Sequence, residues 1–139
     1  MAGRQAHSAM IAPYLTCSLL DESMDEDRRA AIRFAATTPL AYYIGKMGDY
    51  YAQMLTRNGF GAEVEAVQKA WATGMKSAID AVSPALFEAT TLYGTPDEVV
   101  AKLDQWVAAG VDEPLVSIPA GTVEDAEAQL GALMQALQA

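Results

Sequence analysis

The residues of this chain that could do nucleophilic or acid–base chemistry are few and do not group together. His7 is the single histidine and Cys17 is the single cysteine. His7 stands in a polar stretch without an orienting carboxylate, so we expect a solvent-exposed side chain rather than a general base. Cys17 stands in an apolar run with no histidine or carboxylate pattern around it, so we expect a small core residue. No catalytic residue is predicted.

Acidic side chains concentrate in the run DESMDED, from Asp21 to Asp27. This run lacks the alternating ligands and the glycine of a calcium loop, so we predict no metal site. Ser23 and Glu26 have the spacing of a capping box, and acidic residues favour a helix N-terminus. The pattern therefore predicts the start of a helix.

Four tyrosines form two pairs, Tyr42–Tyr43 and Tyr50–Tyr51, in one predicted helix. Aromatic side chains line apolar ligand pockets, which makes Tyr43 and Tyr50 candidates for binding a substrate. The alternative is that tyrosines at helical spacing pack in a core or an interface, and we favour this alternative.

The segment SIPAGTVED leaves a predicted strand and enters a predicted helix. Free backbone N–H groups at a helix N-terminus can bind an anion. Gly121 and Thr122 are therefore candidates for binding the phosphate of a cofactor.

Local signals predict the elements that must position these residues. A short apolar strand is expected within Met10–Leu20, followed by a helix to about Thr37. Thr38 and Pro39 have the types of an N-cap and a first helical residue, which predicts a second helix, and Asn58-Gly59 should end it. Further helices are expected from Gly61 to about Ala81 and, after Ser83-Pro84, through Ala89.

The clearest start signal is Thr95-Pro96-Asp97-Glu98, which combines an N-cap, a proline at the first position and a capping box. Gly110 is typical of a helix end, and a strand is expected at Leu115–Ile118. Thr122 should cap a last helix. The residues predicted to face inward in that helix are Val123, Ala126, Leu130, Leu133 and Leu137.

These elements predict a helix-rich α/β fold with two short parallel strands and about six helices, in one domain over residues 1–139. The two strands lie near opposite ends of the chain, whereas an ordinary crossover takes about a dozen residues or slightly more. A helical excursion must therefore separate them. Because a two-stranded sheet is marginal by itself, we expect it to need further strands.

Composition excludes several classes of partner. The chain has a net charge of −9 and only nine Lys and Arg residues, which argues against nucleic-acid binding. It has no run of about 18 apolar residues, so no membrane span is expected. The single cysteine and the absence of a signal-peptide pattern lead us to expect a cytoplasmic location.

Several segments together resemble the luciferase-like monooxygenase family. The segment YGTPDEVVAKLDQWVAAGVDEPLVSIPAG is similar to the capped helix and final strand of that family. AGRQ and APYLTCSLLDES resemble the approach to a late strand and that strand itself. RFAATTPLAYYIGKMGDYYAQMLTRNGFGAEV resembles a long family helix. The resemblance covers nearly the whole chain, but only the C-terminal portion of the family.

The resemblance implies the C-terminal part of a (β/α)8, or TIM, barrel and a parent oxidoreductase that uses flavin (FMN) or the deazaflavin F420. A complete barrel takes about 250 residues, so the chain is expected to be inactive, and to bind no cofactor, without the remaining strands. The resemblance also implies that the main phosphate loop lies upstream, which counts against Gly121 and Thr122. The expected partner is a complementary barrel half or another copy of the chain. The alternatives are a non-catalytic association module and a small ligand-binding protein.

Overall fold

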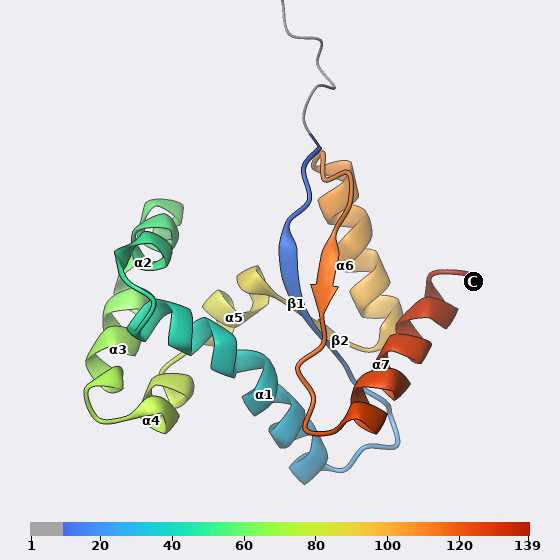
Figure 1. The fold of residues 1–139 in the computed structure, drawn as a ribbon, viewed down its shortest axis with the longest axis horizontal. Helices are drawn as coiled ribbons and strands as arrows, with labels where there is room; N and C mark the ends of the chain where they lie inside the picture. Colours follow the sequence, from blue (N-terminus) through green and yellow to red (C-terminus); the bar gives the residue numbers. More distant parts are fainter. Residues whose placement is uncertain (1–9) are drawn as a thin grey trace, which may run out of the picture.

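A computed structural model describes residues 10–139, which form a three-stranded parallel sheet flanked by helices (Figure 1). The helix-rich α/β class is therefore confirmed. The elements, in chain order, are β1 (Tyr14–Leu19), α1 (Glu26–Gly45), α2 (Asp49–Leu55), the π-helical segment η1 (Thr56–Phe60), α3 (Gly61–Trp71), α4 (Met75–Asp80), α5 (Pro84–Thr90), β2 (Thr91–Gly94), α6 (Pro96–Ala108), β3 (Leu115–Ser117) and α7 (Val123–Ala136).

The sheet has the order β2-β1-β3, so the first strand in the sequence lies in the middle. The prediction of two strands was wrong, because β2 is a third. β2 pairs with the last four residues of β1, from Thr16 opposite Thr91 to Leu19 opposite Gly94. β3 pairs with the N-terminal half of β1. β2 has four residues between two helices, too few for a recognisable pattern, and only its pairing with β1 makes it a strand.

The buried side chains form two clusters. One lies among the helices α1 to α5, and Figure 1 shows these helices together on one side of the sheet. The other joins β1 and β2 to α6 and α7. Leu15, Cys17 and Leu19 supply β1's part of this second cluster. These three alternate residues therefore face α6 and α7.

The opposite face of the sheet is covered unevenly. Toward the C-terminal end of β1, Ser18 is fully buried, and its register partner Tyr93 packs against the helical cluster. Toward the N-terminal end, Tyr14 is 71% exposed and its register partner Leu115 is 46% exposed. Parallel sheets are normally covered on both faces. Among residues 10–139, nothing buries this apolar pair.

Helix α1 differs from the sequence-based prediction in two places, at its N-cap and at the predicted break before Pro39. Its N-cap is Asp25, whose side chain accepts a hydrogen bond from Arg28 N–H, instead of Ser23. Thr38-Pro39 does not start a new helix, because Pro39 lies inside α1. Proline removes one backbone donor. The helix nevertheless continues, since the turns after it bury Leu40 and Ile44 in the helical core.

The helix predicted from Gly61 to about Ala81 is two helices. α3 ends at Trp71 and α4 begins at Met75, with Gly74 between them at φ 142°. That backbone conformation is accessible to glycine and interrupts a helix. The helix predicted from Thr38 to Asn58 is broken earlier, because α1 ends at Gly45 and α2 begins at Asp49. At the predicted end the chain kinks, since Gly59 has φ 95° within η1.

The local caps of the second half are confirmed. Ser83, Thr95 and Thr122 each accept a hydrogen bond from the backbone N–H three residues later. The inward face predicted for α7 was largely wrong. Leu133 is buried, but exposed apolar residues form a stripe along the helix: Val123, Leu130, Met134 and Leu137. None of the helices in residues 10–139 has the length and apolar character needed to cross a membrane.

Candidate functional site

The carboxyl ends of the parallel strands define the region in which a site is expected. Ligands of parallel α/β folds bind beyond the carboxyl ends of the strands. Beyond β1 and β2 lies a cavity of about 520 Å³. Its lining comes from the loop after β1, the start of α6 and one face of α7: Leu19, Leu20, Asp21, Glu22, Met24, Thr95, Pro96, Asp97, Ala128, Gln129 and Ala132.

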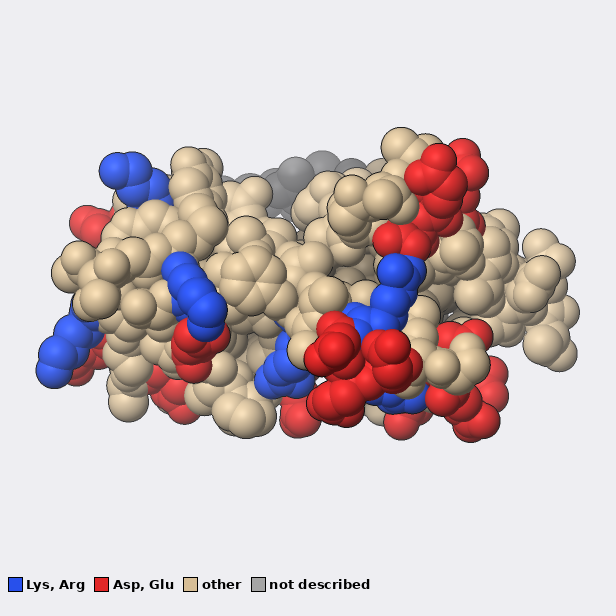
Figure 2. Space-filling model, turned by 90° about the horizontal axis from the view of Figure 1, so that it is seen from below, with Lys and Arg blue, Asp and Glu red and all other residues tan. Residues whose placement is uncertain are grey.

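The charge of this lining is acidic. Asp21, Glu22 and Asp97 contribute carboxylates, and no Lys or Arg belongs to it. Hydrogen bonds from Ser23, with a smaller contribution from Arg29, hold the pKa of Asp21 below its ordinary value, so this carboxylate stays ionised at neutral pH. Figure 2 views the molecule from the end toward which the strands of Figure 1 run. Acidic side chains gather on this face, with some basic side chains among them. The cavity therefore disfavours a phosphate group.

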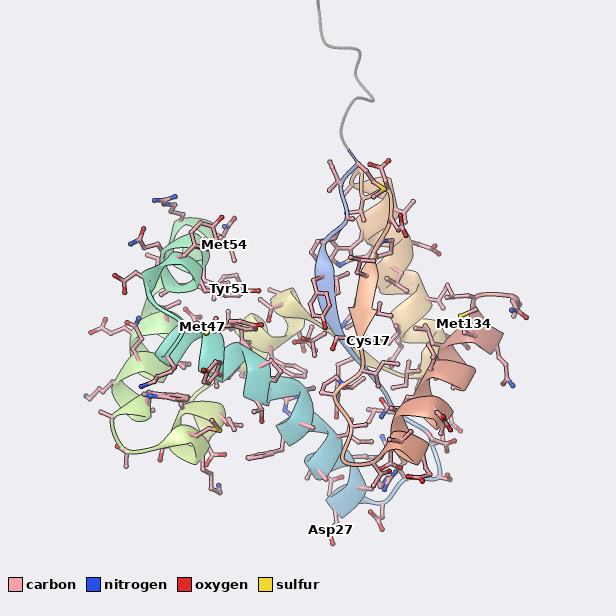
Figure 3. The ribbon with its side chains drawn as sticks, viewed as in Figure 1. Cys17, Asp27, Met47, Tyr51, Met54 and Met134 are labelled. Atoms are coloured by element: carbon pink, nitrogen blue, oxygen red, sulfur yellow. The ribbon has the colours of Figure 1, made fainter. Side chains whose placement is uncertain are left out.

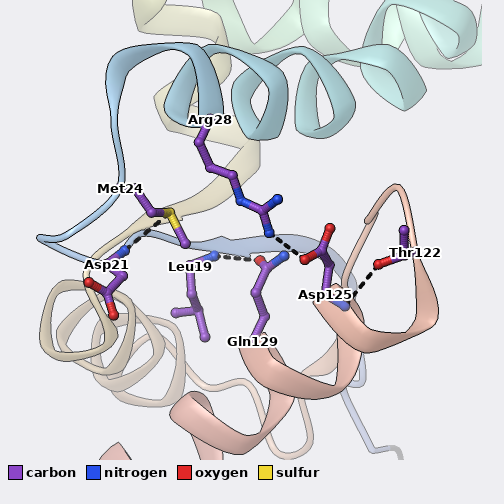
Figure 4. A network of polar contacts seen from close by, with 7 residues as sticks. All are labelled: Leu19, Asp21, Met24, Arg28, Thr122, Asp125 and Gln129. Atoms are coloured by element: carbon purple, nitrogen blue, oxygen red, sulfur yellow. Dashed lines mark hydrogen bonds and ion pairs between the residues drawn. The ribbon is translucent and has the colours of Figure 1, made fainter.

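Gln129 lies next to this cavity and supplies an acceptor to β1 beyond the point where its pairing with β3 ends. β3 ends at Ser117, opposite Thr16, so the Leu19 N–H has no strand partner on that side. Gln129 Oε1 accepts this hydrogen bond at 2.9 Å, and the side chain is buried (Figure 4). The sequence analysis missed Gln129, because a single glutamine in an amphipathic helix gives no signal of a distant backbone partner.

The predicted phosphate candidates Gly121 and Thr122 lie where they were expected, at the start of α7. Thr122 Oγ1 accepts from Asp125 N–H at 3.1 Å, and Asp125 pairs with Arg28 of α1 (Figure 4). The first turn thus carries the carboxylates of Glu124 and Asp125, which oppose a bound anion. Phosphate binding at this turn remains a prediction.

The tyrosine candidates are placed apart from the ends of the strands. Tyr43 stacks on Tyr51, with ring centroids 5.0 Å apart and an interplanar angle of 17°. Figure 3 shows Tyr51 with Met47 and Met54 in the helical part of the molecule. Tyr42 meets Trp71 edge-on at 6.1 Å, whereas Tyr50 is 81% exposed. Tyr43 therefore belongs to a packed aromatic group, and a substrate-binding role for Tyr43 or Tyr50 remains a prediction.

Cys17 is a core residue, as expected. Its side chain is fully buried on β1 (Figure 3), and burial raises its pKa to about 11. The thiolate is the reactive form of cysteine, so this thiol is inert at neutral pH. The other candidate nucleophile or base, His7, lies outside the described residues.

Ser18 is a polar residue that the sequence analysis did not single out. It is fully buried on β1, and its Oγ has no hydrogen-bond partner among residues 10–139. An unsatisfied buried hydroxyl costs about 1–3 kcal/mol. Alternation along β1 places Ser18 on the face opposite Cys17, toward the helical cluster.

The family model described as luciferase-like monooxygenase matches residues 1–113, which include every element from β1 to α6. No solved structure matches the chain.

Proposed function

This chain belongs to the luciferase-like monooxygenase family, and we propose that it forms the C-terminal part of a barrel-type oxidoreductase that uses FMN or F420. The observation that carries the proposal is the direct parallel pairing of β1 with β3, with α6 leading into β3 and α7 leaving it. A (β/α)8 barrel repeats this arrangement of parallel strands and outer helices.

In this proposal β1 and β3 are consecutive barrel strands, and α1 to β2 form an excursion between them. This assignment has to account for the strand order, because consecutive barrel strands lie in chain order whereas β1 lies between β2 and β3. Consecutive barrel strands lie side by side, and β3 lies beside β1 although β2 comes between them in the sequence. β2 pairs only with the last four residues of β1, so it serves the excursion at the mouth of the barrel.

Neither the cavity beyond the ends of β1 and β2 nor the start of α7 fits a cofactor phosphate. The cavity at the ends of the strands has acidic residues and no cation, and the start of α7 carries Glu124 and Asp125. The redox chemistry belongs to the cofactor, and the protein positions it. We therefore assign this chain the role of closing the barrel, while the remaining strands hold the cofactor phosphate.

Fluorescence titration tests this division of roles. The isolated 139-residue chain should bind neither FMN nor F420 at micromolar concentration. Addition of a protein fragment with the preceding barrel strands should restore cofactor binding and oxidation of the reduced cofactor. Micromolar binding by the isolated chain would contradict the proposed location of the cofactor site. Failure of the mixed fragments to bind would contradict the barrel assignment.

A second candidate function is association without catalysis. Two exposed apolar surfaces favour it: the pair Tyr14 and Leu115 on the sheet, and the stripe on α7. Exposed apolar surface of this kind marks protein contacts. Sedimentation of the isolated chain should show self-association, and the double variant Tyr14→Ser, Leu115→Ser should reduce it. A folded monomer at all concentrations would argue against this candidate.

A further inference from the structure

Arg33 lies on α1 against two aromatic rings. Its guanidinium carbon is 4.4 Å from the centroid of the Phe87 ring and 5.9 Å from that of Tyr93. The two rings meet edge-on with centroids 5.2 Å apart. Phe87 is buried, so the ring beneath the guanidinium is held in place. Cation–π contact therefore holds the guanidinium of Arg33 near the end of β2.

The hydrogen-bond donors of Arg33 are not used by a carboxylate. Three other cations among residues 10–139 are engaged: Arg28 pairs with Asp125, Lys76 pairs with Asp80, and Arg29 donates to backbone carbonyls. Within residues 10–139, no ion pair is formed by Arg33. A guanidinium has five N–H donors arranged in a fork that matches carboxylate and phosphate.

Arg33 faces a cavity of about 470 Å³ between α1, α5 and α6. The cavity is lined by Leu20, Arg33, Phe87, Glu88, Tyr93, Gly94, Glu98, Ala101, Lys102 and Gln105. Lys102 adds a second cation, and its Nζ lies 3.5 Å from the Tyr93 carbonyl oxygen.

Two carboxylates also belong to this lining. Glu98 caps the start of α6, because its Oε2 accepts hydrogen bonds from Thr95 N–H at 2.8 Å and from Thr95 Oγ1 at 3.1 Å. Glu88 is exposed on α5, as Arg33 is on α1, and it forms no ion pair with Arg33 or Lys102. The N–H donors at the cavity are therefore those of Arg33, which reach no acceptor among residues 10–139, and those that Lys102 keeps beyond its bond to the Tyr93 carbonyl.

We propose that this cavity binds a small organic anion whose carboxylate or phosphate group is held by Arg33 and Lys102. The volume suits a small molecule with an organic body in addition to its charged group. Phe87 and Tyr93 orient Arg33 and offer an apolar wall. All the lining residues belong to this chain, and the proposed ligand is a small organic anion other than the redox cofactor.

Nuclear magnetic resonance of the 139-residue chain tests the proposal at constant ionic strength. Benzoate and phenyl phosphate serve as probes with the same ring and different anionic groups, and benzamide serves as the neutral control. We expect saturable shifts at the Arg33 side-chain Nε–H and at the Tyr93 and Gly94 amides. A stronger response to one of the two anions identifies the preferred group. Shifts with benzamide equal to those with the anions would overturn the proposal.

Matched variants separate this cavity from general surface charge. Arg33→Gln and Lys102→Gln should each weaken binding at least tenfold, and Arg57→Gln and Lys69→Gln, which alter cations outside the cavity, should not. Arg33→Lys keeps the charge without the fork and should bind with intermediate affinity. Circular dichroism checks that each variant is folded. The proposal fails if Arg33→Gln binds the probes as tightly as Arg57→Gln does.

Discussion

The backbone N–H of Leu19 donates a hydrogen bond of 2.9 Å to the side-chain oxygen of Gln129 on α7. This bond replaces the strand partner that β1 loses where β3 ends, and it ties the last helix to the middle of the sheet. A buried N–H left without a partner costs about 1–3 kcal/mol. The contact therefore makes the position of α7 depend on one side chain.

Gln129→Leu should lower the free energy of unfolding by about 1–3 kcal/mol, since it keeps the size of the side chain and removes the acceptor. Urea unfolding followed by circular dichroism measures the change. Gln135→Leu, at an exposed position of the same helix, is the matched control and should change stability little. Equal stability of the two variants would show that the Leu19 N–H is satisfied in another way.

Gly45 ends α1 directly against the indole of Trp71. A β-carbon at this position would lie 2.6 Å from Trp71 ring atoms, which is too close for any real contact. Gly45→Ala should therefore destabilise the protein by about 1–3 kcal/mol through displacement of the indole. Thermal unfolding measures the effect, and tryptophan fluorescence reports the displacement.

Gly131 is the control for this prediction. It lies in the middle of α7, and an added β-carbon would meet nothing within 4 Å. Gly131→Ala should raise stability by about 0.5–1 kcal/mol, because alanine favours a helix over glycine. The same sign of change at both glycines would contradict the close approach of Trp71 to Gly45.

The capping box of α6 should make stability depend on acid pH. Hydrogen bonds from the Thr95 backbone and side chain hold the pKa of Glu98 below its ordinary value of 4.5. The folded state therefore binds this proton more weakly than the unfolded state. The contribution of Glu98 should be complete above pH 4.5 and should be lost as the pH falls through the lowered pKa.

Unfolding of Glu98→Gln between pH 7 and pH 3 checks this dependence. The variant should be less stable than the original chain at neutral pH, and the difference should shrink at low pH. Asp97→Asn, which alters the adjacent first-turn carboxylate outside the capping box, is the comparison. A difference that grows on acidification would mean that the pKa of Glu98 is raised in the folded protein.

Cys17 should be protected from thiol reagents in the native protein. The side chain is fully buried and its pKa is about 11, so labelling requires the sheet to open. Reaction with a disulfide reagent at pH 8 should be slow in buffer and complete within seconds in guanidinium chloride. Fast labelling in buffer would place Cys17 outside the packed cluster between the sheet and α6.

The sequence alone determined the ends of several helices. Ser83, Thr95 and Thr122 cap α5, α6 and α7, and Gly110 follows α6 with φ 103°, as predicted. These features depend on hydrogen bonds and backbone angles within three or four residues, so residue type and spacing suffice. The family was also identified from sequence segments, because their residues and their order can be read without knowing which segments meet in the fold.

The tertiary structure decided the rest of the fold and most of the candidate sites. β2 is a strand because β1 supplies its hydrogen bonds, Pro39 remains inside α1 because the following turn is buried, and Gln129 is polar in a core because Leu19 needs an acceptor. The cavity at Arg33 is also a product of the tertiary structure, because its lining comes from α1, α5 and α6. Each of these features depends on residues far away in the sequence. Local propensity cannot predict them, because only packing brings those residues into contact.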